Sequence, residues 1–229
     1  MDPLAEKYRN IGGYVYCANN PVMFIDPDGR KIRGVKMING QITYTKRAIK
    51  NGTQRYIEAR MQTKSGTESI MSMLGDKKEY SLLTTDKTFV LPTENGKYAV
   101  AAGVTDHNSG TILISTNKNG YDNVTDDQLK NAVTLDMDGD LMNISVKRKD
   151  LVNPIGDRGE YNRAYNDAGM KEFEQQYPYQ SENEQIHGTG AHEENHLFNP
   201  QNAGKVYQDE TQAFEAEKNA RKEYRNENK

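Results

Sequence analysis

The sequence has 229 residues, 34% of them hydrophobic, and its 30 basic and 33 acidic side chains give a formal net charge of −3. This length suits one or two compact domains, and the near balance of charge excludes an overall basic field for nucleic acid while arguing against disorder. The single cysteine, Cys17, excludes an internal disulfide framework and any zinc site built on paired cysteines, whereas three of the four histidines fall within ten residues of one another.

The first thirty residues alternate tyrosine-rich pieces with turns. Tyr14 and Tyr16 precede a turn at Asn19–Pro21, and a second turn follows at Asp26–Gly29. The pattern predicts short strands joined by tight turns, which bury too little surface to fold alone and so belong to a larger β-structure. No apolar stretch follows a basic start here, so we expect no signal peptide, and no run of 18 apolar residues predicts a membrane helix anywhere.

The string YVYCANNPVMFIDPDGR resembles the end of the core of RHS-repeat proteins, which closes with a Y-x-Y-x-x-N-N-P segment and a D-P-x-G turn. The resemblance implies an RHS-core tail and junction at 1–30 and a toxin domain at 31–229, with a catalytic core of about 50–229. Asp26 and Asp28 match aspartates that serve self-cleavage in the family. The duplicated motif that supports cleavage is absent, so a plain type I turn is the simpler interpretation.

The same resemblance implies how the chain would be used. A toxin domain behind an RHS junction would be a secreted bacterial effector, delivered within a larger RHS polypeptide that carries the export signal. Its expected partners are the RHS shell of that polypeptide, a target-cell protein and a cognate immunity protein, as in interbacterial competition. Nucleic acid and membrane are not expected partners.

The middle of the chain predicts a hairpin, a helical region and several strands. Residues 31–47 alternate apolar and polar side chains around Asn39-Gly40, a strong hairpin signal. A helical rhythm runs over 54–74 with an interruption at Ser65-Gly66. Short strands are predicted at 80–85, 87–91, 97–105 and 111–116, each bounded by Gly, Asn, Asp or Pro.

Residues 133–146 allow two interpretations. Asp136, Asp138 and Asp140 have the alternate spacing of a calcium loop. However, Gly139 stands in the wrong place for an EF-hand, and the twelfth position is Lys147. A hairpin that turns at Asp138-Gly139 is therefore favoured over a calcium site.

The sequence His192-Glu193-Glu194-Asn195-His196 is an H-E-x-x-H motif. On a helix, residues i and i+4 lie about 40° apart around the axis and about 6 Å along it, so both imidazoles can reach one ion. Zinc there would acidify a water molecule, and Glu193 would take its proton as general base. The motif alone has a fair chance of arising by accident, so a third ligand is needed.

A third ligand is available on the next predicted helix. The segment VYQDETQAFEAEKNARKEYRNE is rich in helix formers, and its face with Glu210 and Glu217 would pack against the motif. Glu210 can complete a His-His-Glu set with water in the fourth position. Glu217 is the rival ligand, or else a group that orients a ligand histidine.

HEENH followed by DETQAFEAE resembles the gluzincin type of zinc metallopeptidase, in particular the toxin tips of RHS-type proteins. The resemblance implies zinc as cofactor, ligands His192, His196 and Glu210, and Glu193 as the catalytic base of a metalloendopeptidase. Two features depart from the family: only 13 residues separate His196 from Glu210, and glycines precede the motif where a continuous helix is usual.

The implied fold is α+β and zincin-like. We expect β-hairpins, a small twisted sheet with the 111–116 strand at its edge beside the motif, and a C-terminal helix that supplies the third ligand. Tyr207 and Tyr224 are candidates to steady an oxyanion, and His187 is expected to be exposed. The alternatives are a metal-dependent nuclease toxin and a non-catalytic binding module with a structural zinc.

Overall fold

The computed structural model describes residues 32–93, 96–117, 123–152, 158–202 and 205–228, and the predicted RHS tail and junction at 1–30 lie outside them. The strands are β1 (Val35–Ile38), β2 (Gln41–Tyr44), β3 (Ser81–Thr85), β4 (Phe89–Pro92), β5 (Tyr98–Ala101), β6 (Gly103–Asp106), β7 (Thr111–Ser115), β8 (Ala132–Leu135), β9 (Leu141–Ile144) and β10 (Leu151–Val152). The helices are α1 (Lys46–Lys50), α2 (Thr53–Arg60), α3 (Lys64–Gly75), α4 (Asp126–Lys130), α5 (Arg158–Asp167), α6 (Met170–Gln176), α7 (Glu182–Phe198) and α8 (Val206–Glu227), with short 3-10 helices at Arg148–Asp150 and Pro200–Asn202. The fold is α+β, as predicted.

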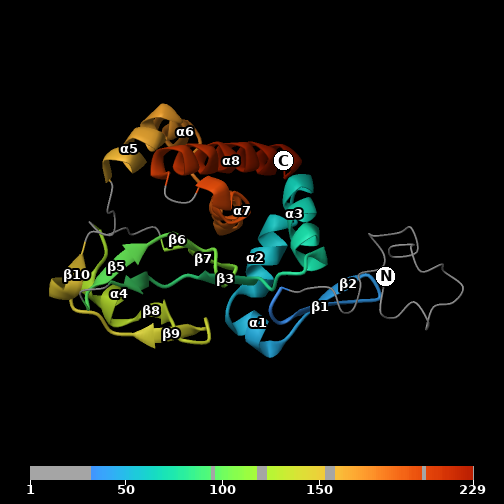
Figure 1. The fold of residues 1–229 in the computed structure, drawn as a ribbon, viewed down its shortest axis with the longest axis horizontal. Helices are drawn as coiled ribbons and strands as arrows, with labels where there is room; N and C mark the ends of the chain where they lie inside the picture. Colours follow the sequence, from blue (N-terminus) through green and yellow to red (C-terminus); the bar gives the residue numbers. More distant parts are fainter. Residues whose placement is uncertain (1–31, 94–95, 118–122, 153–157, 203–204, 229) are drawn as a thin grey trace, which may run out of the picture.

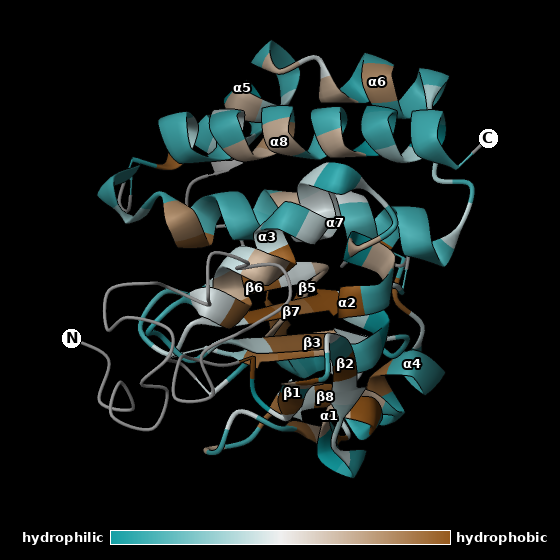
Figure 2. Ribbon diagram, turned by 90° about the vertical axis from the view of Figure 1, so that its right-hand side faces the viewer, coloured by the Kyte–Doolittle hydropathy of each residue, from teal (hydrophilic) through white to brown (hydrophobic). Residues whose placement is uncertain are grey.

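The elements form successive layers (Figure 1). The sheets lie on one side of α7, α8 lies on its other side, and α5 and α6 cover the far face of α8. Hydrophobic residues concentrate on β3, β5 and β7, whereas α7 and α8 are largely hydrophilic (Figure 2). None of the described helices is both long and apolar enough to cross a membrane. The polar helices α7 and α8 therefore meet each other away from the most apolar strands.

The described strands form two mixed sheets and one separate hairpin. The three-stranded sheet has the order β3-β7-β6, with β3 parallel and β6 antiparallel to β7. The five-stranded sheet has the order β10-β5-β4-β8-β9. The predicted strand over 97–105 is thus two strands, because the chain leaves one sheet after Ala101 and enters the other at Gly103.

The strand beside α7 at the sheet edge is β6, so the prediction that 111–116 forms this edge is wrong. Every residue of β7 is buried, and β7 pairs with β3 on one side and β6 on the other. A run buried on both faces is typical of a central strand. Both β6 and β7 contact α7, but β6 is the outer one of the two.

Two hairpins were predicted correctly. Asn39 and Gly40 have φ values of 50° and 77° between β1 and β2, the left-handed pair that a type I′ turn requires. In the β8–β9 turn, Asp136 Oδ1 accepts from the backbone N–H groups of Asp138 and Asp140 at 2.9 and 2.8 Å. These bonds form the hairpin that was favoured over a calcium loop.

The helical region over 54–74 breaks earlier than predicted. α2 ends at Arg60, and α3 begins at Lys64 with Thr63 as its N-cap. The Thr63 hydroxyl accepts from the N–H of Gly66 at 3.1 Å, so Ser65-Gly66 lies in the first turn of α3 and does not interrupt a helix. Met73 of α3 is fully buried in the main hydrophobic cluster between α2, α3, β3, β7 and α7.

Candidate metal centre

α7 runs without a break through the glycines that precede the histidines. Ser181 caps its N-terminus by accepting from the N–H of Glu184. A Cβ on Gly188 would lie 2.7 Å from Cγ of Arg221, and one on Gly190 would lie 3.0 Å from Cδ of Arg60. The missing side chains thus allow α8 and α2 to approach α7 closely. The helix α7 is continuous through Gly188 and Gly190, and these glycines serve its close packing against α8 and α2.

His192, His196 and Glu210 converge between α7 and α8, with one potential ligand atom from each lying within 4.8 Å of the others. His192 Nε2 is 3.4 Å from Glu210 Oε2, and His196 Nε2 is 3.9 Å from Glu210 Oε1. All three side chains are largely buried, with exposed fractions of 11% for each histidine and 19% for Glu210. The structure therefore brings together the three residues for which the sequence predicts metal ligation.

The Nδ1 atom of each histidine faces a carboxylate other than Glu210. His196 Nδ1 lies 2.9 Å from Asp209 Oδ2, and His192 Nδ1 lies 3.5 Å from Glu217 Oε2. Histidine ligands commonly present one ring nitrogen to a metal while a carboxylate orients the other. Glu217 therefore takes the orienting position that the sequence left open for it, and Glu210 faces the shared point between the histidines.

The electrostatics of this cluster favour a positive charge. Burial lowers the pKa of His192, but contacts with Glu210 and Glu217 outweigh it and raise this pKa to about 10. Burial would raise the pKa of Glu217, yet His192, Tyr179 and Arg221 lower it overall, so Glu217 is ionised. The tyrosine hydroxyl donates to Glu217 Oε1 at 2.5 Å. The anionic groups thus surround a point that suits a cation.

The donor set fits a divalent metal. Glu210 Oε2 is buried and makes no hydrogen bond within the described part of the chain. Ligands about 2.1 Å from a tetrahedral zinc stand roughly 3.4 Å apart. The separation of His192 Nε2 and Glu210 Oε2 equals this distance at 3.4 Å, and one ligand atom from each of the three residues lies within 4.8 Å of the others. Two imidazoles and one carboxylate are also the donor types that zinc accepts in catalytic sites.

Comparison with protein-family models, curated proteins and solved structures finds no significant match to the chain.

Glu193 points away from α8 toward β6. The Thr105 hydroxyl lies 2.7 Å from Glu193 Oε2 and 3.0 Å from the Glu193 carbonyl oxygen. The Glu193 residue is 8% exposed. Its Oε1 lies so close to Gly103 that a Cβ added to Gly103 would be only 2.3 Å from it. The predicted base therefore sits between its own helix and the edge strand, next to the His192 ligand.

Glu194, the third residue of the motif, anchors α7 to α2 and α3. Arg60 forms a two-pronged interaction with it, Nε to Oε1 at 2.9 Å and Nη2 to Oε2 at 2.7 Å. The hydroxyls of Tyr56 and Ser69 donate to the same carboxylate at 2.9 and 2.7 Å. The sequence analysis did not assign this role, because the partners are more than 120 residues away.

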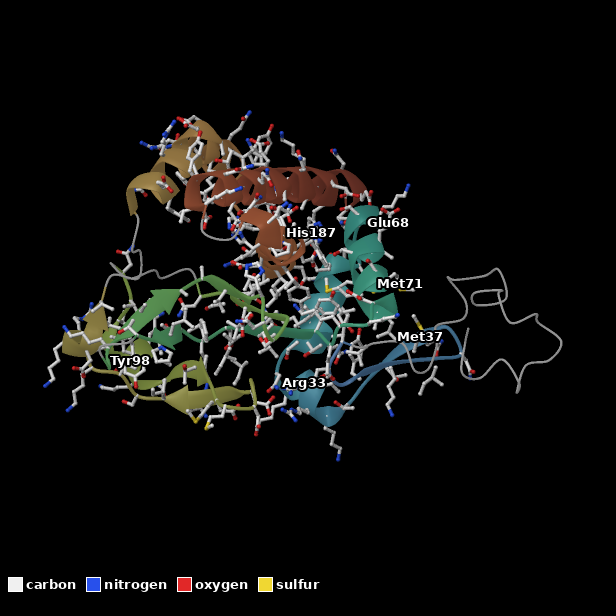
Figure 3. The ribbon with its side chains drawn as sticks, in the orientation of Figure 1. Arg33, Met37, Glu68, Met71, Tyr98 and His187 are labelled. Atoms are coloured by element: carbon white, nitrogen blue, oxygen red, sulfur yellow. The ribbon has the colours of Figure 1, made fainter. Side chains whose placement is uncertain are left out.

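The prediction that His187 is exposed is wrong. His187, labelled in Figure 3, is fully buried, with Arg60 Nη1 3.3 Å from its ring nitrogens. Burial and the nearby Arg60 charge lower its pKa to about 3. The ring also packs against Tyr224, with centroids 5.4 Å apart. His187 is therefore a neutral packing residue on the side of α7 that faces α2 and α8.

The two tyrosines proposed for an oxyanion make contacts elsewhere, and a third tyrosine packs near His192. Tyr207 donates its hydroxyl to Asp167 at 2.7 Å, and Tyr224 packs on His187. Tyr161 of α5 packs edge-on against Phe214, with centroids 5.5 Å apart, and Phe214 packs against His192 in the same way at 4.9 Å. Burial and the charges of Glu210 and Glu217 raise the pKa of Tyr161. Its hydroxyl makes no hydrogen bond to the described residues.

Proposed function

We propose that this chain is a zinc-dependent metallopeptidase of zincin-like architecture that acts as the toxin domain of an RHS-type polypeptide. The convergence of His192, His196 and Glu210 on one point carries the peptidase proposal, and Glu193 follows His192 directly on the same helix. The resemblance of residues 1–30 to an RHS-core tail supports delivery as an effector. The proposed partners are a target-cell protein, an immunity protein and the RHS shell.

The residues have distinct chemical tasks in this proposal. His192 and His196 supply neutral imidazole nitrogens and Glu210 an anionic oxygen, which leaves a fourth position for water or substrate. Zinc there would polarise the substrate carbonyl and acidify water. Glu193 takes a proton from the attacking water and returns it to the leaving amine nitrogen.

The open edge of β6 suits an extended peptide. Ser115 N–H donates to the Ala102 carbonyl at 2.7 Å, so by the alternation of an antiparallel pair Gly103 and Thr105 turn their peptide groups away from β7. β6 ends its sheet among the described strands. A substrate strand could add there beside Glu193, which supports peptide as the substrate class.

The deciding experiment compares wild type with E193Q and H192A. We expect about one zinc per chain in wild type and E193Q, and less than about a tenth of an equivalent in H192A, because of the two substituted residues His192 is a ligand and Glu193 is not. Induced in a bacterial host that lacks the immunity protein, wild type should arrest growth and both variants should not. E215Q serves as control, since Glu215 is 51% exposed on α8 and pairs only with Lys218.

Three results would overturn the proposal. Absence of zinc from metal-loaded wild type would remove the ligand assignment. Growth arrest by E193Q equal to wild type would show that toxicity does not need the base, as expected for a binding module with a structural metal. Degradation of a plasmid with magnesium, lost on His196→Ala, would point to a nuclease instead.

A further inference from the structure

Two residues of β6 contact different oxygens of the Glu193 carboxylate. The Thr105 hydroxyl lies 2.7 Å from Oε2, and a Cβ on Gly103 would come within 2.3 Å of Oε1 and 2.9 Å of Cδ. We infer that β6 is a positioning strand for the base: Thr105 holds one oxygen of Glu193, and Gly103 provides the space that the other occupies. This inference rests on the proposed function, because it assigns the task of Glu193 to metal-dependent chemistry.

The pairing of strand and helix places both contacts on one face. Gly103 and Thr105 are two residues apart in β6, so their side-chain positions share the face that α7 covers. Their peptide groups meanwhile point to the open edge of the sheet. The same two residues therefore fix the base and present the backbone to which an extended substrate would add.

The Thr105 hydroxyl has one proton to donate, and its shorter contact is with the charged Oε2 of Glu193, at 2.7 Å. Besides Oε2, it lies 3.0 Å from the carbonyl oxygen of Glu193. A glutamate side chain loses much rotamer freedom when it is fixed, and a hydrogen bond from a half-buried hydroxyl restricts it before any ligand arrives. Preorganisation of this kind requires a hydroxyl, so serine should replace threonine and valine should not.

The test uses the zinc-loaded full chain and acetohydroxamic acid as probe. A hydroxamate binds zinc through two oxygens and passes its proton to a neighbouring base, so its affinity reports a correctly placed Glu193 without a known substrate. Affinity for acetohydroxamic acid is measured by calorimetry, and zinc affinity is measured separately by competition with a chelator. A purely structural role of Thr105 would alter folding or zinc affinity, not the hydroxamate affinity alone.

We expect T105V to weaken acetohydroxamic acid binding about tenfold, the loss of one charge-assisted hydrogen bond, and T105S to stay within about twofold of wild type. G103A should weaken the probe as well, because its Cβ displaces Oε1. Zinc affinity should change by less than about twofold in all three. T43V is the matched control: Thr43 of β2 is a half-buried strand threonine, like Thr105, and its hydroxyl donates to the Lys36 carbonyl of the β1–β2 hairpin.

The outcomes separate this inference from the proposed function. If wild type binds no zinc, or if E193Q binds acetohydroxamic acid as tightly as wild type, the proposed function fails and the role of β6 fails with it. If E193Q weakens the probe while folded T105V and G103A bind it like wild type, only the role of β6 is overturned. If T105V does not fold, the comparison of G103A with wild type tests the role of β6. T105S, which keeps a hydroxyl at position 105, should still bind the probe like wild type.

Discussion

At the scale of single residues, the two carboxylates around His192 face different ring nitrogens. Glu210 lies against Nε2 and Glu217 against Nδ1, at 3.4 and 3.5 Å. An imidazole binds a given metal ion through only one of its two nitrogens. Only the glutamate on the side of that nitrogen can be a ligand of the same ion as His192. Oε1 of Glu217 also accepts the hydroxyl of Tyr179 and pairs with Arg221, which leaves Oε2 to face Nδ1 of His192.

Substitution of each carboxylate should therefore lower zinc affinity by a different amount. We predict that E210Q abolishes tight zinc binding because it removes a ligand, whereas E217Q and D209N lower zinc affinity by about 10–100-fold because they only misorient a histidine. Competition with a chromophoric chelator measures all three, with E215Q as the exposed control on the same helix. A larger loss in E217Q than in E210Q would contradict the order and make Glu217 the third ligand.

The sequence predicted the centre of this site but not its surroundings. His192, His196 and Glu210 follow from helix periodicity, because spacing along a helix determines which side chains share a face. Thr105 and Gly103 carry no such signal, since their contacts depend on how β6 approaches α7 in three dimensions. Asp209 is not distinguished in the sequence either, because an aspartate next to the ligand Glu210 looks like any other acidic residue in the first turn of a helix.

At the scale of elements, α7 is held to α2 by two ion pairs of very different burial. Arg60 and Glu194 are only 4% and 5% exposed, whereas Arg55 and Glu182 are 33% and 61% exposed. Both arginines belong to α2 and both glutamates to α7. A buried pair broken on one side leaves a charge without a partner, whereas an exposed pair is replaced by water.

This pair of contacts gives a matched comparison of stability. We predict that R60M lowers the free energy of unfolding by about 3–5 kcal/mol, because Glu194 then stays buried and unpaired. R55M should cost less than about 1 kcal/mol. Urea denaturation followed by circular dichroism measures both. Equal effects in the two variants would show that burial does not govern how α7 is anchored.

Boundaries between elements were the least predictable part of the fold. Residues 97–105 have a continuous strand-like composition, but the chain changes sheets at Ala102, and a local pattern cannot show which strands a segment will join. The break near Thr63 was detectable in principle, since a threonine before a helical run is a good N-cap. Gly66 suggested a break at its own position, but it lies in the first turn of α3.

At the scale of the whole molecule, the candidate metal centre borders one of the smaller hydrophobic clusters, because His192 packs against Phe214, which belongs to the cluster of α5, α6 and α8. The largest cluster joins α2, α3, β3, β7 and parts of α7, and it forms without contributions from the predicted ligands. The fold therefore has a source of stability that does not depend on a metal.

Metal removal should consequently leave the fold intact. We predict that the chelated protein keeps its far-ultraviolet circular dichroism, and that zinc at about 100 times its Kd adds roughly 2.7 kcal/mol of stability, because it binds only the folded state. For a chain of this length, that corresponds to a rise in Tm of roughly 5–11 °C. Scanning calorimetry with and without zinc measures the shift, and H192A should show none. Loss of helical signal on chelation would contradict the prediction and would identify the metal as a structural one.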